Sequence, residues 1–399
     1  MSTRGIASVC VKDPVLNDPR IRPHVPPIYA TSTFVYEDHE TLKRIHEGES
    51  GYVYTRWDNP TAKVVEEKIA ALEAHGLDIP HASALFFSSG MAAMSAALMS
   101  VVNAGDTIVT HSNIYGTTGE LLSTTLSRFG VRTVFGDVHD MQWLRGALEH
   151  DHARILLIET PNNPTLDCYD LEALSGLAHG YNANVVVDNT FASPVIQQPF
   201  RFGADLIAHS TTKYLNGHGT GIGGIVIGKD KELMAQVWYQ RKVVGGNASP
   251  FEAWALNNGL KTLPLRMERH CTNAMHVAQW LNDRTEVAKV NYPGLESHAR
   301  HELAKKQMTG FGGMLSFELK GGLQAGVALM KNIRFCTLTA TLGTADTLIQ
   351  HPASTSHVQV PREQRIAGGI TDGLVRMSIG IEDVEDVIGD LEQALKASL

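Results

Sequence analysis

The middle of the chain, residues 58–259, alternates short apolar runs with amphipathic helical patterns. Val65, Ile69 and Leu72 recur at helical spacing and predict a helix over about 62–73. Strands that alternate with helices predict an α/β fold, in which a mostly parallel sheet is flanked by helices. The other predicted elements are a small-residue helix at 91–99 and strands at 107–110, 132–135, 155–158, 185–187, 206–208 and 224–227.

The two flanking stretches follow different patterns. Residues 1–57 are rich in proline in their first half and predict an extended N-terminal arm that contacts a neighbouring subunit. Residues 260–399 mix strands with helices and predict a smaller C-terminal α+β domain, with strands at 314–319 and 374–379. Its last helix should begin after Asp383, a predicted N-cap, because apolar residues then recur at helical spacing.

Composition narrows the class of protein. A chain of 399 residues with 43% hydrophobic and 19% charged residues is ordinary for a soluble protein with more than one structural part. The net charge of -8 gives no support for nucleic-acid or membrane partners. No apolar stretch approaches a membrane span or a signal peptide. The four scattered cysteines favour free thiols in the cytoplasm over disulfides or a metal site.

Lys213 and Asp188 each end an apolar strand pattern, where ligands bind in open α/β sheets. A lysine that can form a Schiff base suits pyridoxal 5'-phosphate (PLP). An aspartate that can keep a pyridine nitrogen protonated suits it too. A solvated lysine and a helix-capping aspartate are the alternatives for each residue alone. Together, the two residues predict a PLP enzyme in which both are catalytic.

Residues that could bind the cofactor phosphate surround this pair. Gly90 and Met91 follow two serines at the start of a predicted helix, where backbone N–H groups favour an anion. Ser210 and Thr212 would add hydroxyl groups just ahead of the lysine. A tight strand–helix turn is the alternative for Gly90, but the small-residue helix behind it favours phosphate binding.

Tyr115 and Arg376 are further candidates for catalysis. Tyr115 follows a predicted strand and can stack on the PLP ring or transfer a proton; a core tyrosine is the alternative. Arg376 lies inside an apolar strand, where an unpaired charge is costly. A substrate carboxylate would be a suitable partner, and an ion pair with an acid such as Glu382 is the rival interpretation.

Two more motifs contain polar groups with a possible role. Glu159 and Asn163 end another predicted strand, and the Asn163 amide can hold the phenolic oxygen of the cofactor or form a turn. Tyr54 and Arg56 lie in a glycine-led aromatic segment that can bind a phosphate or carboxylate. Packing at an interface would be compatible with that role.

These motifs occur together in a known family. Over almost its whole length the chain resembles the fold-type I PLP enzymes of cysteine and methionine metabolism. These include methionine γ-lyase, cystathionine γ-lyase, cystathionine γ-synthase and the O-acylhomoserine sulfhydrylases. The matching motifs are Tyr54-Thr55-Arg56, Ser89-Gly90-Met91, Tyr115-Gly116, Glu159-Thr160-Pro161, Val187-Asp188-Asn189-Thr190, His209-Ser210-Thr211-Thr212-Lys213, His351-Pro352-Ala353-Ser354 and the Arg376 strand.

The resemblance implies a homotetramer of two active dimers and a role for each motif. Lys213 would carry PLP and move protons between the substrate α- and β-carbons, Asp188 would pair with the pyridine nitrogen, and Tyr115 would stack on the ring. The implied cofactor contacts are Tyr54 and Arg56 of a neighbouring subunit, Gly90, Met91, Glu159, Asn163, Ser210 and Thr212. The implied contacts to the amino-acid substrate are Thr117, Asn163, Thr341 and Arg376.

The same resemblance implies that a group leaves the substrate γ-carbon. Water would then give 2-oxobutyrate and ammonia, whereas sulfide would give homocysteine. Thr117 replaces the cysteine usual in methionine γ-lyases, and Ala340 replaces the glutamate usual in cystathionine-processing enzymes. Sulfhydrylases tend to have asparagine at the position of Thr341. A lysine at the position of Lys242 is more typical of methionine γ-lyases. We expect methionine α,γ-elimination, with O-acylhomoserine sulfhydrylase and then cystathionine γ-lyase or γ-synthase as alternatives.

Overall fold

The computed structural model describes residues 4–14, 23–150, 152–358 and 361–397, and these contain two sheets. The larger sheet has seven strands in the order β1-β7-β6-β5-β4-β2-β3. β1 and β7 run antiparallel to their neighbours and the other pairs are parallel, so the predicted α/β fold is confirmed. Its strands are β1 (Ser83–Phe87), β2 (Thr107–His111), β3 (Arg132–Gly136), β4 (Ala153–Glu159), β5 (Asn184–Asp188), β6 (Leu206–Ser210) and β7 (Gly224–Gly228).

Helices cover both faces of this sheet because its strands are apolar on both sides. In β4, Ile155 and Leu157 pack in the cluster that contains α4 (Gly90–Met99) and α9 (Lys231–Val244). Leu156 and Ile158 point the other way, towards the second set of helices. That set includes α3 (Pro60–Glu73), α6 (Met141–His150), α7 (Leu171–Gly180) and α10 (Pro250–Leu260).

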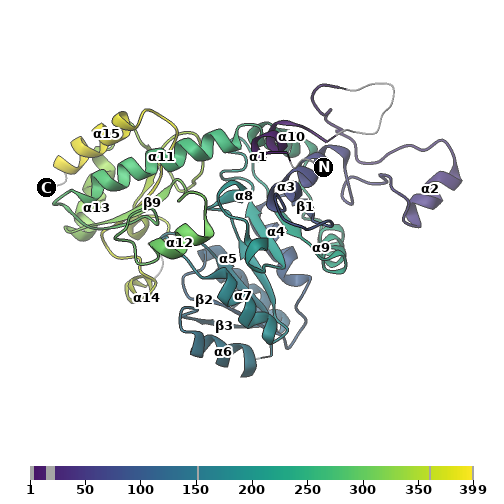
Figure 1. The fold of residues 1–399 in the computed structure, drawn as a ribbon, viewed down its shortest axis with the longest axis horizontal. Coiled ribbons are helices and arrows are strands. Elements are labelled where there is room, and N and C mark those ends of the chain that lie inside the picture. The colour runs from purple at the N-terminus through teal and green to yellow at the C-terminus, as the bar shows by residue number, and fades with distance from the viewer. Residues whose placement is uncertain (1–3, 15–22, 151, 359–360, 398–399) are drawn as a thin grey trace.

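The smaller sheet lies at the other end of the molecule (Figure 1). Its order is β10-β11-β12-β9-β8, and three helices pack on its apolar face. The strands are β8 (Val287–Asn291), β9 (Met314–Leu319), β10 (Thr337–Leu338), β11 (Leu348–Gln350) and β12 (Leu374–Ser378). The helices are α11 (Leu263–Asn282), α13 (Gly322–Asn332) and α15 (Val384–Lys396).

Short elements make the remaining connections. They are α5 (Gly116–Glu120), α8 (Ser193–Ile196), α12 (His301–Gln307) and α14 (Arg362–Ala367), with single turns at Leu121–Thr125, Leu126–Phe129, Pro199–Phe202 and Pro352–Ser354. In the described chain, no helix combines the length and the apolar character needed to cross a membrane.

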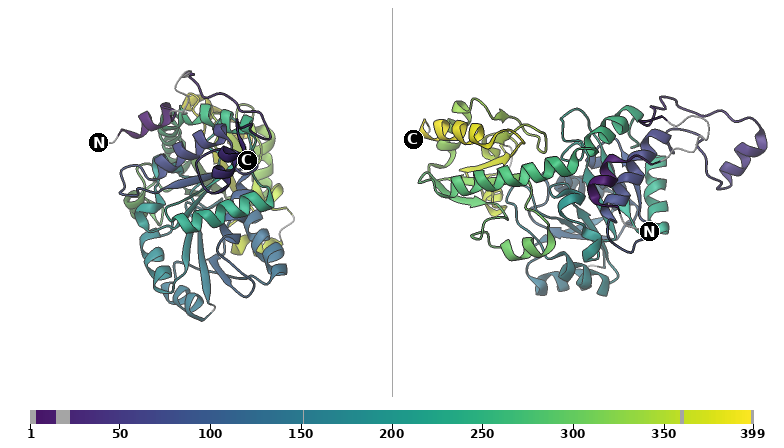
Figure 2. Two further views of the ribbon diagram at one scale, coloured as in Figure 1. Left: turned by 90° about the vertical axis from the view of Figure 1, so that its right-hand side faces the viewer. Right: turned by 45° about the horizontal axis from the view of Figure 1, so that its top comes forward.

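Residues 1–57 are less irregular than their prolines predict. They contain α1 (Ile6–Val11) and α2 (His39–His46), although residues 1–3 and 15–22 lie outside the described chain. α1 packs against the body because Cys10 is fully buried in the main core. α2 buries no residue and lies apart from the body of the molecule (Figures 1 and 2).

The expected cap of the last helix is only half right. Asp383 does occupy the N-cap position of α15, but its side chain accepts no hydrogen bond from the first turn. Its carboxylate instead lies 3.3 Å from the guanidinium of Arg269. Glu385 and Asp386 supply the acidic charge in the first turn.

Candidate active site

Polar side chains converge on a cavity of about 230 Å³ at the carboxyl ends of β4, β5 and β6. This edge of an open α/β sheet is where such proteins bind ligands. The cavity is lined by ten of the predicted residues: Gly90, Met91, Tyr115, Glu159, Asn163, Asp188, Ser210, Thr212, Lys213 and Arg376. The sheet topology therefore brings together residues that lie up to 286 positions apart in the chain, as Gly90 and Arg376 do.

The amine of Lys213 is placed as a nucleophile. It follows β6 and donates a hydrogen bond to the hydroxyl of Thr341 at 3.0 Å. Burial, with a smaller effect of the positive charge of Arg376, lowers the pKa of Lys213 to about 8. Roughly a tenth of the amine is therefore neutral at pH 7, far more than for an ordinary lysine, and attack on an aldehyde requires this neutral form.

Asp188 ends β5 beside Glu159, its register partner at the end of β4. Its carboxylate accepts the backbone N–H of Thr190 at 3.0 Å, and burial raises the pKa of the Asp188 carboxyl. No ion pair in the described chain includes Asp188. A bound group with a protonated ring nitrogen would supply the cationic partner that this carboxylate lacks.

The phosphate end of the cavity is built by close backbone approach. A side chain at Gly90 would place its Cβ 2.8 Å from the Cβ of Ser210, so only glycine lets α4 begin so close to the end of β6. Ser89 caps this helix by accepting the N–H of Ala92 at 3.0 Å. The site therefore combines the start of α4 with the hydroxyl of Ser210, which suits a phosphate group.

Two other residues expected to bind the phosphate have side chains that already contact neighbouring residues. The hydroxyl of Thr212 accepts the N–H of Gly223 at 3.1 Å. The sulfur of Met91 lies 3.8 Å from the hydroxyl of Thr118. Both residues still line the cavity, so Met91 can offer its backbone and Thr212 its remaining hydrogen-bonding capacity.

Arg376 lies on the face of β12 opposite the apolar core residues. Its guanidinium donates to Asn163 Oδ1, to the carbonyls of Ala340 and Thr341, and to Gln350 Oε1, at 3.0 to 3.2 Å. None of these acceptors is charged, and burial lowers the pKa of Arg376 to about 10. The rival pairing with Glu382 is wrong, because both oxygens of that carboxylate bind Thr347. A ligand carboxylate would balance the buried charge.

Tyr115 is not a core residue. It is 44% exposed and lines the cavity. The backbone N–H of Tyr115 donates to Glu159 at 2.7 Å. An aromatic ring at this place can stack on a planar cofactor.

Four predicted residues lie outside the cavity lining. Tyr54 and Arg56 are exposed, with the guanidinium 5.1 Å from the tyrosine ring centre, and Thr117 is exposed at the start of α5. Thr341 does not line the cavity but bonds to Lys213. Side chains that the sequence reasoning did not select do line it: Met94, Thr118, Thr190, Phe191, His209 and Ile222.

Thr190 had a signal in the sequence that was not used. An aspartate whose side chain accepts the backbone N–H of the residue two positions later is a common turn pattern. Here the Thr190 N–H binds Asp188, while the Thr190 hydroxyl accepts the N–H of Ser210 at 2.9 Å. Thr190 therefore ties the ends of β5 and β6 together under the cavity.

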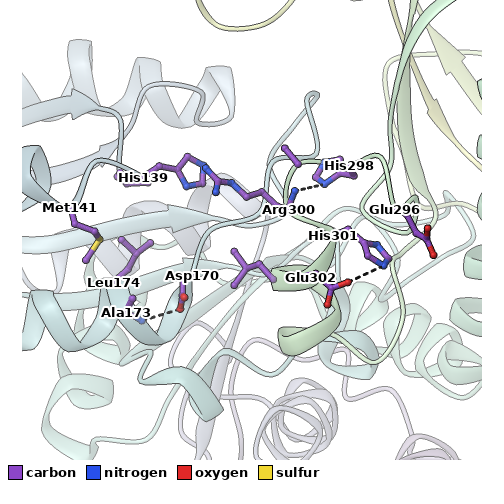
Figure 3. Close-up of a pocket in the computed structure, with 13 residues that line it drawn as sticks. His139, Met141, Asp170, Ala173, Leu174, Glu296, His298, Arg300, His301 and Glu302 are labelled. Atoms are coloured by element: carbon purple, nitrogen blue, oxygen red, sulfur yellow. Dashed lines mark hydrogen bonds and ion pairs between the residues drawn. The ribbon is translucent and has the colours of Figure 1, made fainter.

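A larger cavity of about 700 Å³ lies elsewhere, between α7 and the segment that leads into α12 (Figure 3). Two of its polar side chains already have partners in the protein: His139 bonds to Asp167 at 2.7 Å, and Asp170 caps α7 through the N–H of Ala173. Figure 3 also shows the contact between His301 and Glu302. The cavity contains none of the predicted residues, so its size does not make it the active site.

The residues of the smaller cavity fit PLP. Lys213 offers an amine with a lowered pKa, Asp188 a carboxylate that forms no ion pair among the described residues, and the Gly90 turn a cradle for phosphate. PLP, when bound, supplies the electron sink that stabilises negative charge at the substrate carbon.

Sequence and structure comparisons point the same way. The chain is 48% identical over 374 residues to an L-methionine gamma-lyase of Fusobacterium nucleatum subsp. polymorphum, covering 93% of each chain. It is 36% identical to an O-succinylhomoserine sulfhydrylase of Pseudomonas aeruginosa, covering 94% of this chain and 91% of the other. The crystal structure of a cystathionine gamma synthase from Xanthomonas oryzae pv. oryzae, in complex with aminoacrylate and cysteine, superposes with a TM-score of 0.92. It is 37% identical and covers 99% of this chain and 98% of that one.

The family assignment rests on nearly the whole chain. The profile described as "Cys/Met metabolism PLP-dependent enzyme" matches residues 7–396. The family and the cofactor expected from the motifs are confirmed by this match, and the fold by the structural likeness. The chain belongs to the PLP-dependent enzymes of cysteine and methionine metabolism.

Proposed function

We propose that this enzyme catalyses α,γ-elimination on L-methionine, giving 2-oxobutyrate, ammonia and a thiol. The observation that carries the proposal is the placement of the Lys213 amine and the buried Arg376 guanidinium in one cavity. A base and a carboxylate-binding group in one cavity suit a reaction on an amino acid. The choice of methionine is supported by the relatives, since identity to the named methionine gamma-lyase is 48%, against 36% for the named sulfhydrylase.

Each residue then has a task. Arg376 and Asn163 bind the substrate carboxylate, which orients the α-hydrogen towards Lys213. The amine of Lys213, with its lowered pKa, would accept the α-proton, give that proton up again, and then accept a β-proton before the γ-substituent leaves. Asp188 holds the cofactor ring nitrogen, and Tyr115 covers the ring face and can protonate the leaving thiolate.

The proposal includes a second subunit at the active site. Tyr54 and Arg56 are exposed in their own chain, on the arm of residues 1–57 that also carries α2. α9 and α10 expose large apolar side chains, which a partner would cover: Tyr239, Val243, Val244, Phe251 and Trp254. We infer a homotetramer of active dimers, in which each arm carries Tyr54 and Arg56 to the phosphate of its neighbour.

Two further expectations belong to the same proposal. Residues 58–259 would form the PLP-binding domain and residues 260–399 the C-terminal domain. The enzyme would work in the cytoplasm, which agrees with its cysteines being free, three of them buried.

O-acylhomoserine sulfhydrylase is the second candidate function. Thr117 in place of a cysteine and the 36% identity to the named O-succinylhomoserine sulfhydrylase favour it. Both reactions use the same residues up to loss of the γ-substituent, so products separate them. PLP-loaded enzyme is given O-acetylhomoserine with excess sulfide. 2-Oxobutyrate and ammonia as the main products support elimination; homocysteine as the main product makes the enzyme a sulfhydrylase.

A further inference from the structure

Both oxygens of the Glu159 carboxylate accept hydrogen bonds from backbone N–H groups of the protein. One oxygen accepts the backbone N–H of Tyr115 at 2.7 Å, and the other accepts the backbone N–H of Asn163 at 2.9 Å. Glu159 itself is 5% exposed. A buried carboxylate that accepts two N–H groups makes strong, directional contacts with both. Glu159 therefore joins the loop after β2 to the loop after β4.

Each of these loops carries a group that the proposed reaction needs. Tyr115 presents its ring to the cavity after β2. Asn163 follows β4, and its side-chain oxygen accepts a hydrogen bond from Arg376 at 3.2 Å. One carboxylate thus fixes both the residue that would cover the cofactor and, through Asn163, the residue that would bind the substrate carboxylate.

The backbone of Glu159 is held just as firmly. Its N–H donates to Nε2 of His111 at 3.1 Å, and burial lowers the pKa of His111 to about 3, so this imidazole is neutral and can accept. The ring of Tyr169 packs against His111 at 4.7 Å and against His139 at 4.8 Å. His139 forms part of the wall of the larger cavity (Figure 3). Tyr169 therefore helps to hold the imidazole of His111, which accepts the N–H at the end of β4.

Ionisation of Glu159 matters for the contacts, because a protonated carboxyl would turn one oxygen from an acceptor into a donor. The groups that face it are Asp188 on β5, His111 on β2, and Tyr115 and Tyr169 on the adjoining loops. Burial first, and then the negative charge of Asp188, raise the pKa of Glu159 to about 8. A cationic ring nitrogen against Asp188 would offset that charge and favour the ionised form.

We propose that Glu159 is a positioning residue that aligns Tyr115 with the cofactor ring and Arg376 with the substrate. The inference rests on the proposed function for the identity of the substrate. The contacts of Glu159 do not depend on that function. It replaces the expectation that Glu159 contacts the cofactor directly. The alignment requires both carboxylate oxygens to act as acceptors.

The test compares Glu159→Gln with the wild-type PLP-loaded enzyme. An amide has one acceptor oxygen and must turn its NH₂ towards the other backbone N–H, so one loop is released. We expect PLP content to be unchanged, kcat/KM to fall about tenfold or more, and the circular dichroism of bound PLP to change as the Tyr115 ring shifts. In the wild type, kcat/KM should fall as decreasing pH protonates Glu159. The variant carries an amide that does not titrate, so this fall should be absent.

Glu302→Gln is the matched control, since its carboxylate is 84% exposed on the wall of the other cavity and should leave all readouts unchanged. If Glu159→Gln does not fold, Glu159→Asp is measured instead, because its shorter carboxylate cannot reach both N–H groups. Unchanged dichroism, kcat/KM and pH profile in the folded variant would overturn the inference. The dichroism depends only on PLP binding, so it tests Glu159 even if the wild-type enzyme proves to use another substrate.

Discussion

The amine of Lys213 lies 3.0 Å from the hydroxyl oxygen of Thr341, to which it donates a hydrogen bond. The two residues are 128 positions apart, on the β6 side of the cavity and on the segment after β10. This contact holds the lysine in the cavity, where burial lowers the pKa of its amine. The contact therefore links the position of the segment after β10 to the reactivity of the lysine.

The first prediction concerns the pH dependence of cofactor uptake. The pKa of Lys213 is lowered, so the neutral amine becomes available at lower pH than for an ordinary lysine. Covalent incorporation of PLP into cofactor-free enzyme, trapped with borohydride and measured by mass spectrometry, should rise with pH around a midpoint of about 8. Lys305→Ala, at an exposed lysine, should behave as wild type. A midpoint near 10 would contradict the lowered pKa.

The second prediction concerns the phosphate cradle. Gly90→Ala would force the new Cβ against the Cβ and backbone of Ser210, at 2.8 and 3.1 Å. The start of α4 must then move away, and we expect PLP affinity to fall about tenfold or more, measured by equilibrium titration. Gly146→Ala in α6 is the control because its Cβ would meet nothing within 4 Å. Equal affinities for the two variants would show that the Gly90 turn does not bind phosphate.

The third prediction separates substrate binding from cofactor binding. Arg376→Lys replaces a planar group with several donors by a single ammonium, which cannot bind a carboxylate in the bidentate manner. We expect kcat/KM for the amino acid to fall about tenfold to a hundredfold, mainly through KM, with PLP content unchanged. Arg362→Lys, at an exposed ion pair with Asp372, should have no such effect. An unchanged KM would remove Arg376 from the substrate site.

These predictions concern the part of the site that sequence reasoning could reach. Lys213 and Asp188 were recognisable because each ends an apolar run, and parallel strands bring such ends to one edge of a sheet. Arg376 was recognisable as a charge in an apolar strand. The register of β4 against β5, which puts Glu159 beside Asp188, depends on strand pairing and could not be derived from spacing.

Other features depend on tertiary structure in the same way. α1 and α2 are only 6 and 8 residues long in a proline-rich segment, where local propensity is weak, and it is packing of Cys10 in the main core that stabilises α1. The Glu159 contacts use backbone N–H groups of Tyr115 and Asn163, which leave no trace in residue type. Tyr54, Arg56 and Thr117 carry motifs but lie outside the cavity lining of a single chain, so their roles stay predictions.

The fourth prediction concerns Thr117. It is exposed at the start of α5, two residues after Tyr115, and replaces the cysteine expected of methionine γ-lyases. Thr117→Cys should raise kcat/KM for L-methionine relative to O-acetylhomoserine, because a thiol beside Tyr115 changes how the leaving group is handled. The two substrates are assayed on the same preparation, so losses of stability cancel. If the ratio is unchanged, Thr117 is a spectator.

Turnover of L-methionine by the PLP-loaded enzyme tests the central claim most directly. 2-Oxobutyrate, ammonia and methanethiol are quantified side by side for the wild type and for Lys213→Ala. The account predicts equal amounts of the three products from the wild type, and a rate lower by several orders of magnitude for the variant, which lacks the base. No thiol release by the wild type, or near-normal release by Lys213→Ala, would contradict the account.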